Sequence, residues 1–212
     1  MSSINKEKLF CFTNDIPENV ILKGDLAIDT EAMGLKIKRD RLCLIQICDS
    51  DNNVFLIHFP ETNYNYNCDN LKNILLDKDR QKIFHYGRFD ISIIRHYLGL
   101  DDIPNVYCTK IASRLTRTYT DHHGLKSLVN EILLKDLKKE CGTSNWGSDN
   151  LSFEQKQYAI NDVIFLHQIR ENLNNRLKKL NRFKIANEYF NFLNSVCTSD
   201  LMDFEEDLFR HS

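Results

Sequence analysis

The chain has 212 residues, which favours one domain with room for a substantial apolar core. Hydrophobic residues make up 42% and charged residues 27% of it, with only 7 Gly and 3 Pro, so the composition is globular and excludes disordered or collagen-like classes. The 28 Lys and Arg residues nearly balance the 30 Asp and Glu residues. This balance is unlike that of proteins that grip long duplexes through their phosphates, so we expect any bound polyanion to be short or held through metal ions.

The distribution of charged residues argues against membrane insertion and secretion. The longest stretch without a charge, Tyr189 to Ser199, is far shorter than the roughly 18 apolar residues of a membrane span. Charged residues also interrupt the first 25 positions, so we expect no signal peptide, no membrane partner and a cytoplasmic location. The seven cysteines contain no Cys-x-x-Cys pair, which predicts reduced, mostly buried thiols rather than a zinc site or disulfides.

Three short runs rich in β-forming residues open the pattern, separated by turn residues: 25–31, 41–48 and 54–59. They predict an antiparallel meander. A fourth run, 82–86, precedes a helical pattern for which Gly99 is a suitable C-cap. A strand followed by a helix indicates that the sheet continues in α/β fashion.

The second half of the chain has the periodicity of helices. The mixed segment 69–82 is typical of a solvated helix, and further helices are expected at 108–117, 124–134, 152–179 and 182–197. We therefore predict an α/β fold, a mixed sheet covered by helices, in one domain spanning 1–212. The acidic tail, about 198–212, carries enough apolar residues that we expect it to dock or to form an interface.

Two carboxylates end the first expected strand. Asp29 and Glu31 lie two positions apart and project to the same side of a regular strand. Asp29 directly follows the apolar run 26–28, where a carboxylate needs a metal ion or a hydrogen-bonded partner to stay ionised.

Two later acids stand in similar settings. Asp90 opens the helix after the fourth run, where a capping role competes equally with a functional one. Asp162 lies in an apolar helical stretch, one turn after Tyr158. Four carboxylates on separate elements suit two Mg²⁺ or Mn²⁺ ions about 3.5–4 Å apart, which promote in-line phosphoryl displacement. The residue types alone leave open that these acids are caps, salt bridges and surface charges.

Three motifs resemble those of the tyrosine branch of the DEDD exonucleases, which includes ribonuclease D: Asp29-x-Glu31, His85-x₄-Asp90 and Tyr158-x₃-Asp162. The histidine branch carries a His five positions before the last Asp, where this chain has Gln157. Supporting matches lie at 42–47, 109–112, 144–146 and 151–159. The resemblance implies a ribonuclease H-like (DnaQ-like) fold and 3′–5′ exonuclease activity.

The likeness to the nanoRNase C group of alphaproteobacteria covers nearly the whole chain. The matching segments are 31–35, 39–43, 84–90, 108–121 and 200–212. This resemblance implies a closed homo-oligomeric ring, with an octamer as one candidate, to which the tail would contribute.

The resemblance also assigns roles to the five motif residues. Asp29 would bridge both ions, Glu31 and Asp162 would complete the site of the nucleophilic water, and Asp90 would serve the second ion. Tyr158 would orient that water, because a phenol with an ordinary pKa near 10 is a poor base at neutral pH.

Substrate contacts are expected around this centre. Leu35 would be an apolar wedge between the terminal bases, or else a core leucine, and His85 would touch the substrate or make a structural hydrogen bond. Segment 114–123 concentrates cations, hydroxyls and an aromatic ring, which suits a 5′-phosphate and a stacked base; a solvated helix end is the alternative. The candidates there are Arg117, Tyr119 and His122.

The remaining aromatic residues are expected to pack. Trp146, the only tryptophan, is predicted to lie in the core near the helix that carries Tyr158. The stripe within 183–193 suits either the core or a subunit interface.

Taken together, these features predict a two-metal 3′–5′ exoribonuclease that degrades very short single-stranded RNA, above all dinucleotides, to nucleoside 5′-monophosphates. The near-neutral charge fits a substrate with few phosphates. One alternative is a broader ribonuclease D-like RNA-processing or DNA-trimming exonuclease, with DNA as a further ligand. An alternative of another class is a non-catalytic nucleic-acid-binding domain.

Overall fold

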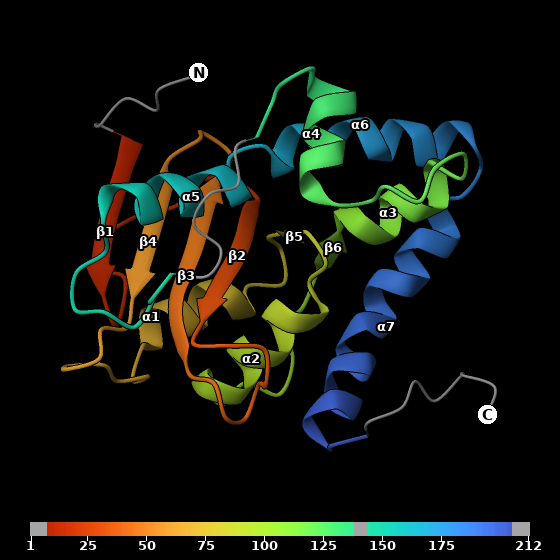
Figure 1. The fold of residues 1–212 in the computed structure, drawn as a ribbon. Coiled ribbons are helices and arrows are strands. Elements are labelled where there is room, and N and C mark those ends of the chain that lie inside the picture. Colours follow the sequence, from red (N-terminus) through yellow and green to blue (C-terminus); the bar gives the residue numbers. More distant parts are fainter. Residues whose placement is uncertain (1–7, 138–143, 205–212) are drawn as a thin grey trace.

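The computed structural model describes residues 8–137 and 144–204 (Figure 1). Six strands form one mixed sheet in the order β1-β4-β3-β2-β5-β6. Their bounds are β1 (Leu9–Thr13), β2 (Leu26–Ala32), β3 (Leu42–Asp49), β4 (Val54–His58), β5 (Lys82–Phe84) and β6 (Val106–Cys108). Strands β2, β3 and β4 pair antiparallel, which confirms the predicted meander, and the other three strands join it in parallel.

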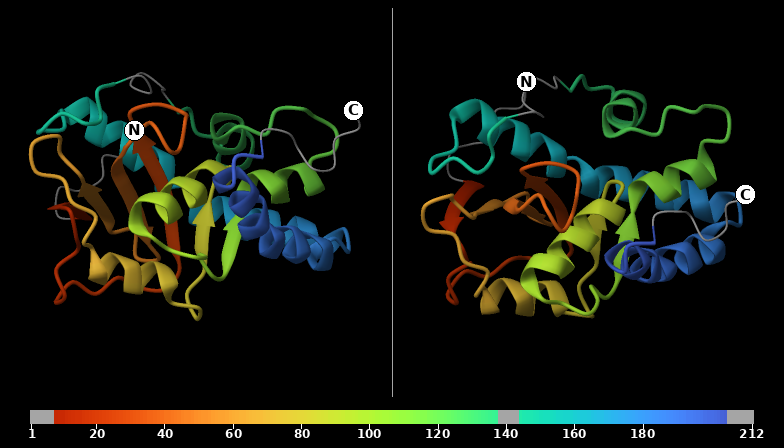
Figure 2. Two further views of the ribbon diagram at one scale, coloured as in Figure 1. Left: turned by 90° about the horizontal axis from the view of Figure 1, so that it is seen from below. Right: turned by 60° about the horizontal axis from the view of Figure 1, so that its bottom comes forward.

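Seven helices surround this sheet within the described residues: α1 (Asp69–Leu76), α2 (Arg88–Leu98), α3 (Thr109–Thr116), α4 (Leu125–Leu133), α5 (Phe153–Val163), α6 (Leu166–Lys179) and α7 (Phe183–Leu201). Helices α5 and α6 lie on one face and α1 on the other, while α3, α4 and α7 extend the molecule beyond β6 (Figures 1 and 2). Every residue of β3 is buried, as expected of a central strand covered on both faces. None of the described helices is long and apolar enough to cross a membrane.

The structure differs from the sequence prediction at both ends of the sheet and in one helix. Strand β1 was not predicted, because its five residues alternate weakly between half-buried and exposed and gain a partner only through β4. The single helix predicted over 152–179 is broken at residues 164–165 into α5 and α6. Four consecutive apolar residues, 163–166, cannot share one face of a straight helix, and the break keeps three of them buried.

One further helix prediction holds only in part, while the end of α2 and the burial of the cysteines are as predicted. The helix expected over 69–82 ends at Leu76, because the buried Lys82 ammonium binds the carbonyls of Asp77 and Arg80 and holds the chain in a loop before β5. Helix α2 ends as predicted at Gly99, whose φ of 67° is left-handed. Five of the six cysteines in the described residues are buried, while Cys141 lies outside them.

The end of α7 docks onto the rest of the fold. Asp200 accepts two hydrogen bonds from the Arg88 guanidinium, at 2.7 and 2.6 Å, and Asp203 pairs with Lys38 at 2.6 Å. The tail was expected to dock over 198–212, and these contacts lie in its described part; residues 205–212 lie outside the described residues.

An internal ion-pair network occupies the segment that was expected to bind a phosphate. Arg117 is only 1% exposed, and its guanidinium donates to the Glu131 carboxylate on α4 and to the His122 carbonyl. The hydroxyl of Tyr119 also donates to Glu131, at 2.6 Å. A buried guanidinium needs a carboxylate partner, so Arg117 has a structural role in this chain.

This network predicts a pH-dependent stability term. The Arg117 guanidinium lowers the pKa of Glu131 to about 2. The ionised Glu131 therefore contributes to the free energy of unfolding above the ordinary carboxyl pKa, and this contribution is lost as the pH falls toward 2. Replacing Glu131→Gln should therefore lower the free energy of unfolding by about 1–3 kcal/mol at pH 7, and by less at low pH. Chemical denaturation at several pH values measures this, with the exposed Glu188→Gln as control. An unchanged stability of Glu131→Gln at pH 7 would contradict it.

Candidate active site

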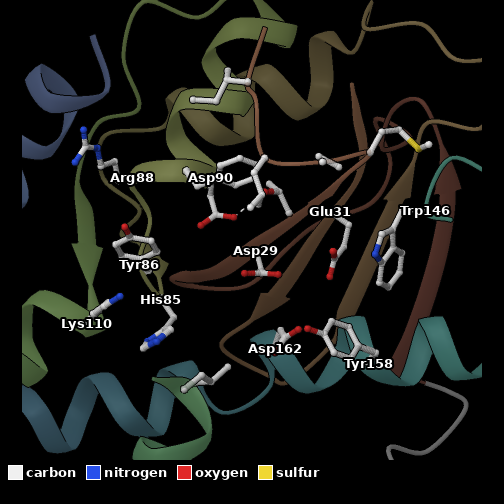
Figure 3. A pocket seen from close by; sticks show the side chains of 18 of the residues that line it. Asp29, Glu31, His85, Tyr86, Arg88, Asp90, Lys110, Trp146, Tyr158 and Asp162 are labelled. Carbon is white, nitrogen blue, oxygen red and sulfur yellow. Dashed lines mark hydrogen bonds between the residues drawn. The ribbon is translucent and has the colours of Figure 1, made fainter. Parts of the chain in front are cut away.

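Three carboxylates from two elements converge where helix α5 covers strand β2. Asp29 and Glu31 lie on β2 and Asp162 lies on α5, and one oxygen of each lies within 4.8 Å of the other two. Figure 3 shows the three side chains pointing into a common space. Because hard oxygen donors in a compact group suit Mg²⁺ or Mn²⁺, these residues fit a divalent metal site.

The local fold explains this convergence. Alternation along β2 places Asp29 and Glu31 on one side, while the intervening Thr30 points to the other. Helix α5 crosses β2 and β3 and brings Asp162 to the same side. A capping box fixes the start of α5: Ser152 Oγ accepts from the Gln155 backbone, and the Gln155 side chain accepts from the Ser152 backbone.

Asp90 reaches the same pocket from the start of α2 but does not belong to the cluster of three. It is 5% exposed and accepts hydrogen bonds from the Thr30 hydroxyl, at 2.6 Å, and from backbone N–H groups including its own. It therefore helps to satisfy the helix start and also lines the pocket. Burial raises its pKa well above the ordinary value, hydrogen bonds from Thr30 oppose this, and the Asp162 charge adds to it.

Tyr158 stands beside Asp162, one helical turn earlier, and their side chains are hydrogen-bonded. Burial raises the phenol pKa, and the neighbouring carboxylates of Asp162, Glu31 and Asp29 raise it further. The phenol is therefore neutral at physiological pH, so it can donate a hydrogen bond but cannot act as a base without first losing its proton.

Trp146 packs against Tyr158 with its ring centroid 5.9 Å away and is 1% exposed, so the prediction of a core position is confirmed. Two side chains bind the backbone on either side of Trp146. Gln155 donates to the Asn145 carbonyl at 3.1 Å, and Arg41 donates to the Gly147 carbonyl at 3.0 Å. One edge of the indole also lines the pocket (Figure 3).

The pocket itself has a volume of about 970 Å³. Opposite the carboxylates lies a wall that sequence reasoning did not identify, made by Tyr86, Arg88 and Lys110 (Figure 3). The Lys110 ammonium lies 3.6 Å from the centroid of the Tyr86 ring, a cation–π contact. Tyr86 has a φ of 64°, and a left-handed tyrosine is a strained conformation that points to function. The only sequence signal for this wall is that these residues fall within the matching segments 84–90 and 108–121.

Leu35 stands at the rim of the pocket and is 85% exposed, so the alternative of a core leucine is wrong. Its loop, between β2 and β3, is built around the Asp40 carboxylate, which accepts from the Lys36 backbone and from Arg39. Gly34 is required there because a Cβ atom would lie 2.3 Å from Asp40 Oδ2. The structure thus presents Leu35 on an ordered loop.

The other expected substrate contacts divide into two groups. His85 shares a hydrogen bond with the Thr109 hydroxyl at 2.9 Å, as the structural alternative expected, and it also lines the pocket, so a substrate contact stays a prediction. Arg117, Tyr119 and His122 do not line the pocket in this chain, and the first two are held by Glu131. The clustering of charges in 114–123 reflects an internal network, which a sequence pattern cannot distinguish from a ligand site.

A sheet with flanking helices and a carboxylate cluster where β2 meets α5 defines a nuclease-like class of site. A family model described as 3′–5′ exonuclease matches residues 11–178, and the chain belongs to this family. Brucella melitensis NrnC is 40% identical, with a TM-score of 0.87 over 97% of this chain and 100% of that one. This NrnC has also been solved bound to pGG and with bound Mg²⁺.

Two curated relatives extend the comparison. DNA polymerase I of Aquifex aeolicus is 31% identical over 156 residues, covering 73% of this chain and 24% of that protein. Ribonuclease D of Jannaschia sp. is 27% identical over 161 residues, covering 74% of this chain and 40% of that protein. The chain thus spans less than half the length of either relative. The predicted exonuclease fold and the resemblance to the ribonuclease D family are confirmed.

The raised pKa of Asp90 gives a prediction for the metal-free protein. A carboxyl group whose pKa is raised by folding contributes stability below its ordinary pKa, and this stability is lost as the pH rises through the folded value. The free energy of unfolding should therefore fall from about pH 4 upward, and the Asp90→Asn variant should lack this part of the decline. Urea denaturation with EDTA between pH 4 and 8 measures the slope. Parallel curves for the two proteins would contradict the prediction.

Proposed function

We propose that the chain is a two-metal 3′–5′ exoribonuclease that degrades very short RNA, above all dinucleotides, to nucleoside 5′-monophosphates. The observation that carries the proposal is the close approach of carboxylate oxygens from Asp29, Glu31 and Asp162 in a pocket also lined by Asp90 and Tyr158. Like charges held this close are stabilised by a bound cation or a proton, and the compact group of hard oxygen donors suits a divalent metal ion. Similarity to Brucella NrnC, solved with pGG and with Mg²⁺, supports both the substrate class and the metal.

The acids would hold the ions and Tyr158 would orient the attacking water. Asp29, Glu31 and Asp162 would hold the first ion, and Asp90 with Asp29 would hold the second. When bound, Mg²⁺ or Mn²⁺ activates water and stabilises charge on the phosphoryl oxygens. The neutral phenol of Tyr158, hydrogen-bonded to Asp162, contributes orientation rather than proton abstraction.

The remaining pocket residues suit the two ends of a short substrate. Leu35 offers an exposed apolar side chain at the rim, positioned to separate or stack bases. On the opposite wall, the Lys110 ammonium and the Tyr86 ring offer a charge for a phosphate and a face for a base, and His85 lies nearby. The substrate contacts expected from Tyr119 and His122 stay predictions, while the buried Arg117 is already paired with Glu131.

The volume of the pocket favours a small ligand. A volume of about 970 Å³ lies at the upper end of the range for small-molecule sites, which fits a dinucleotide.

A DNA-trimming activity is the second candidate, because the chain is similar to a DNA polymerase and the metal ligands act on phosphates without reading the 2′-hydroxyl. The ring-shaped homo-oligomer and the cytoplasmic location remain predictions; α7 offers an exposed apolar row, Ile185, Tyr189 and Phe192, for assembly.

Changes to the metal ligands should abolish turnover. Asp29→Asn and Asp162→Asn should each reduce Mn²⁺-dependent release of mononucleotides from a dinucleotide by more than about 100-fold, because each removes a charge that holds the ions. Tyr158→Phe should lower kcat by about 10-fold to 100-fold while leaving metal affinity unchanged. The exposed Asp101→Asn is the matched control. Wild-type activity in Asp29→Asn would overturn the proposed function, and an inactive wild type would favour the non-catalytic alternative.

Substrate length should decide between the candidates. We expect kcat/KM to fall by at least about 10-fold between RNA of two and seven nucleotides, since a confined pocket binds one end only. The same assay on DNA dinucleotides tests the second candidate. Lys110→Met should reduce kcat/KM more for substrates with a 5′-phosphate than without it, and the exposed Lys184→Met should not. A flat length profile would remove the dinucleotide preference.

A further inference from the structure

Gln46 is a polar residue in the most deeply buried strand of the sheet. It lies in the middle of β3, is 0% exposed, and is flanked by Ile45 and Ile47, which are also fully buried. Burying a primary amide costs free energy unless hydrogen bonds replace those made with water. The side chain of Gln46 therefore needs a hydrogen-bond partner that offsets the free-energy cost of burying its amide.

The partner of Gln46 is the Asp29 carboxylate. The two residues lie opposite each other in the antiparallel β2–β3 ladder, and Gln46 Nε2 donates to Asp29 Oδ2 at 3.4 Å. The other end of the amide, Oε1, is buried and has no hydrogen-bond partner among residues 8–137 and 144–204. The opposite rotamer of the amide would place Oε1 against the carboxylate, where two acceptors repel. The side-chain amide of Gln46 is thus oriented so that Nε2 donates to Asp29, although this orientation leaves Oε1 without a hydrogen bond within the described part of the chain.

We propose that Gln46 is a positioning residue that fixes the orientation of the Asp29 carboxylate for cation binding. This inference rests on the metal site of the proposed function. A hydrogen bond to Oδ2 restricts rotation about the bond that carries the carboxylate and so fixes the direction of both oxygens toward Glu31 and Asp162. Groups that hold a ligand from behind commonly change metal affinity when they are removed.

The chemistry of the amide explains why glutamine suits this position. A leucine would fill the space without donating, and a glutamate would repel Asp29. A lysine or arginine would donate, but its charge would neutralise the carboxylate that attracts the cation. An uncharged donor restrains Asp29 and leaves its negative charge available.

The test measures cation binding without substrate. Trp146 is the only tryptophan and lines the pocket, so quenching of its fluorescence by Mn²⁺ reports the Kd directly. Gln46→Met, which keeps the length but removes the donor, should raise this Kd by about 10-fold. Its metal-free thermal stability should be equal or higher, because the change also removes the buried Oε1. Ile47→Val, on the opposite face of the same strand, should lower stability and leave the Kd unchanged.

The outcomes separate this inference from the proposed function. If Mn²⁺ does not quench the wild-type protein, or if Asp29→Asn binds Mn²⁺ as tightly, the metal site itself is wrong. If the wild type binds but Gln46→Met has the same Kd, with or without a loss of stability, the positioning role is wrong. Should Gln46→Met fail to fold, Gln46→Asn serves instead, because its shorter amide cannot reach Asp29; an unchanged Kd in that variant also overturns the inference.

Discussion

The fold holds several carboxylates close together although their negative charges repel one another. Carboxylate oxygens of Asp29, Glu31 and Asp162 lie within 4.8 Å of one another, and Asp90 lines the same pocket behind a Thr30 hydroxyl. Bringing like charges together in a partly desolvated space opposes folding, and only a bound cation or a proton relieves it. A chain that keeps such an arrangement does so for the ligand that balances it.

The scaffold supplies the rigidity that this arrangement requires. Two of the acids are fixed by the ladder between β2 and the fully buried β3, and the third by a capped helix whose Gln155 also anchors the Trp146 loop. Each of the three acids is therefore supported by residues of β3 or by the capping residues Ser152 and Gln155, which do not line the pocket. Leu35, by contrast, is exposed at the rim of the pocket, on the loop that Asp40 holds.

Much of this could be predicted from the sequence, because the signals were local. The meander, the helix ending at Gly99 and the acids interrupting apolar runs each follow from periodicity and residue type. Features that depend on distant partners could not be predicted. Arg117 looked like a phosphate ligand because Glu131, which occupies it, lies on another helix. Strand β1 and the break between α5 and α6 likewise depend on tertiary contacts that no single segment encodes.

The double hydrogen bond between Arg88 and Asp200 ties the last turn of α7 to the start of α2 at the wall of the pocket. An α-helix advances by about 1.5 Å and turns by about 100° for each residue. A single insertion or deletion between Phe183 and Asp200 would consequently swing that carboxylate to another side of the helix. The number of residues in α7 is thus as tightly constrained as their identity, and the register of this distal helix becomes part of the architecture of the cleft.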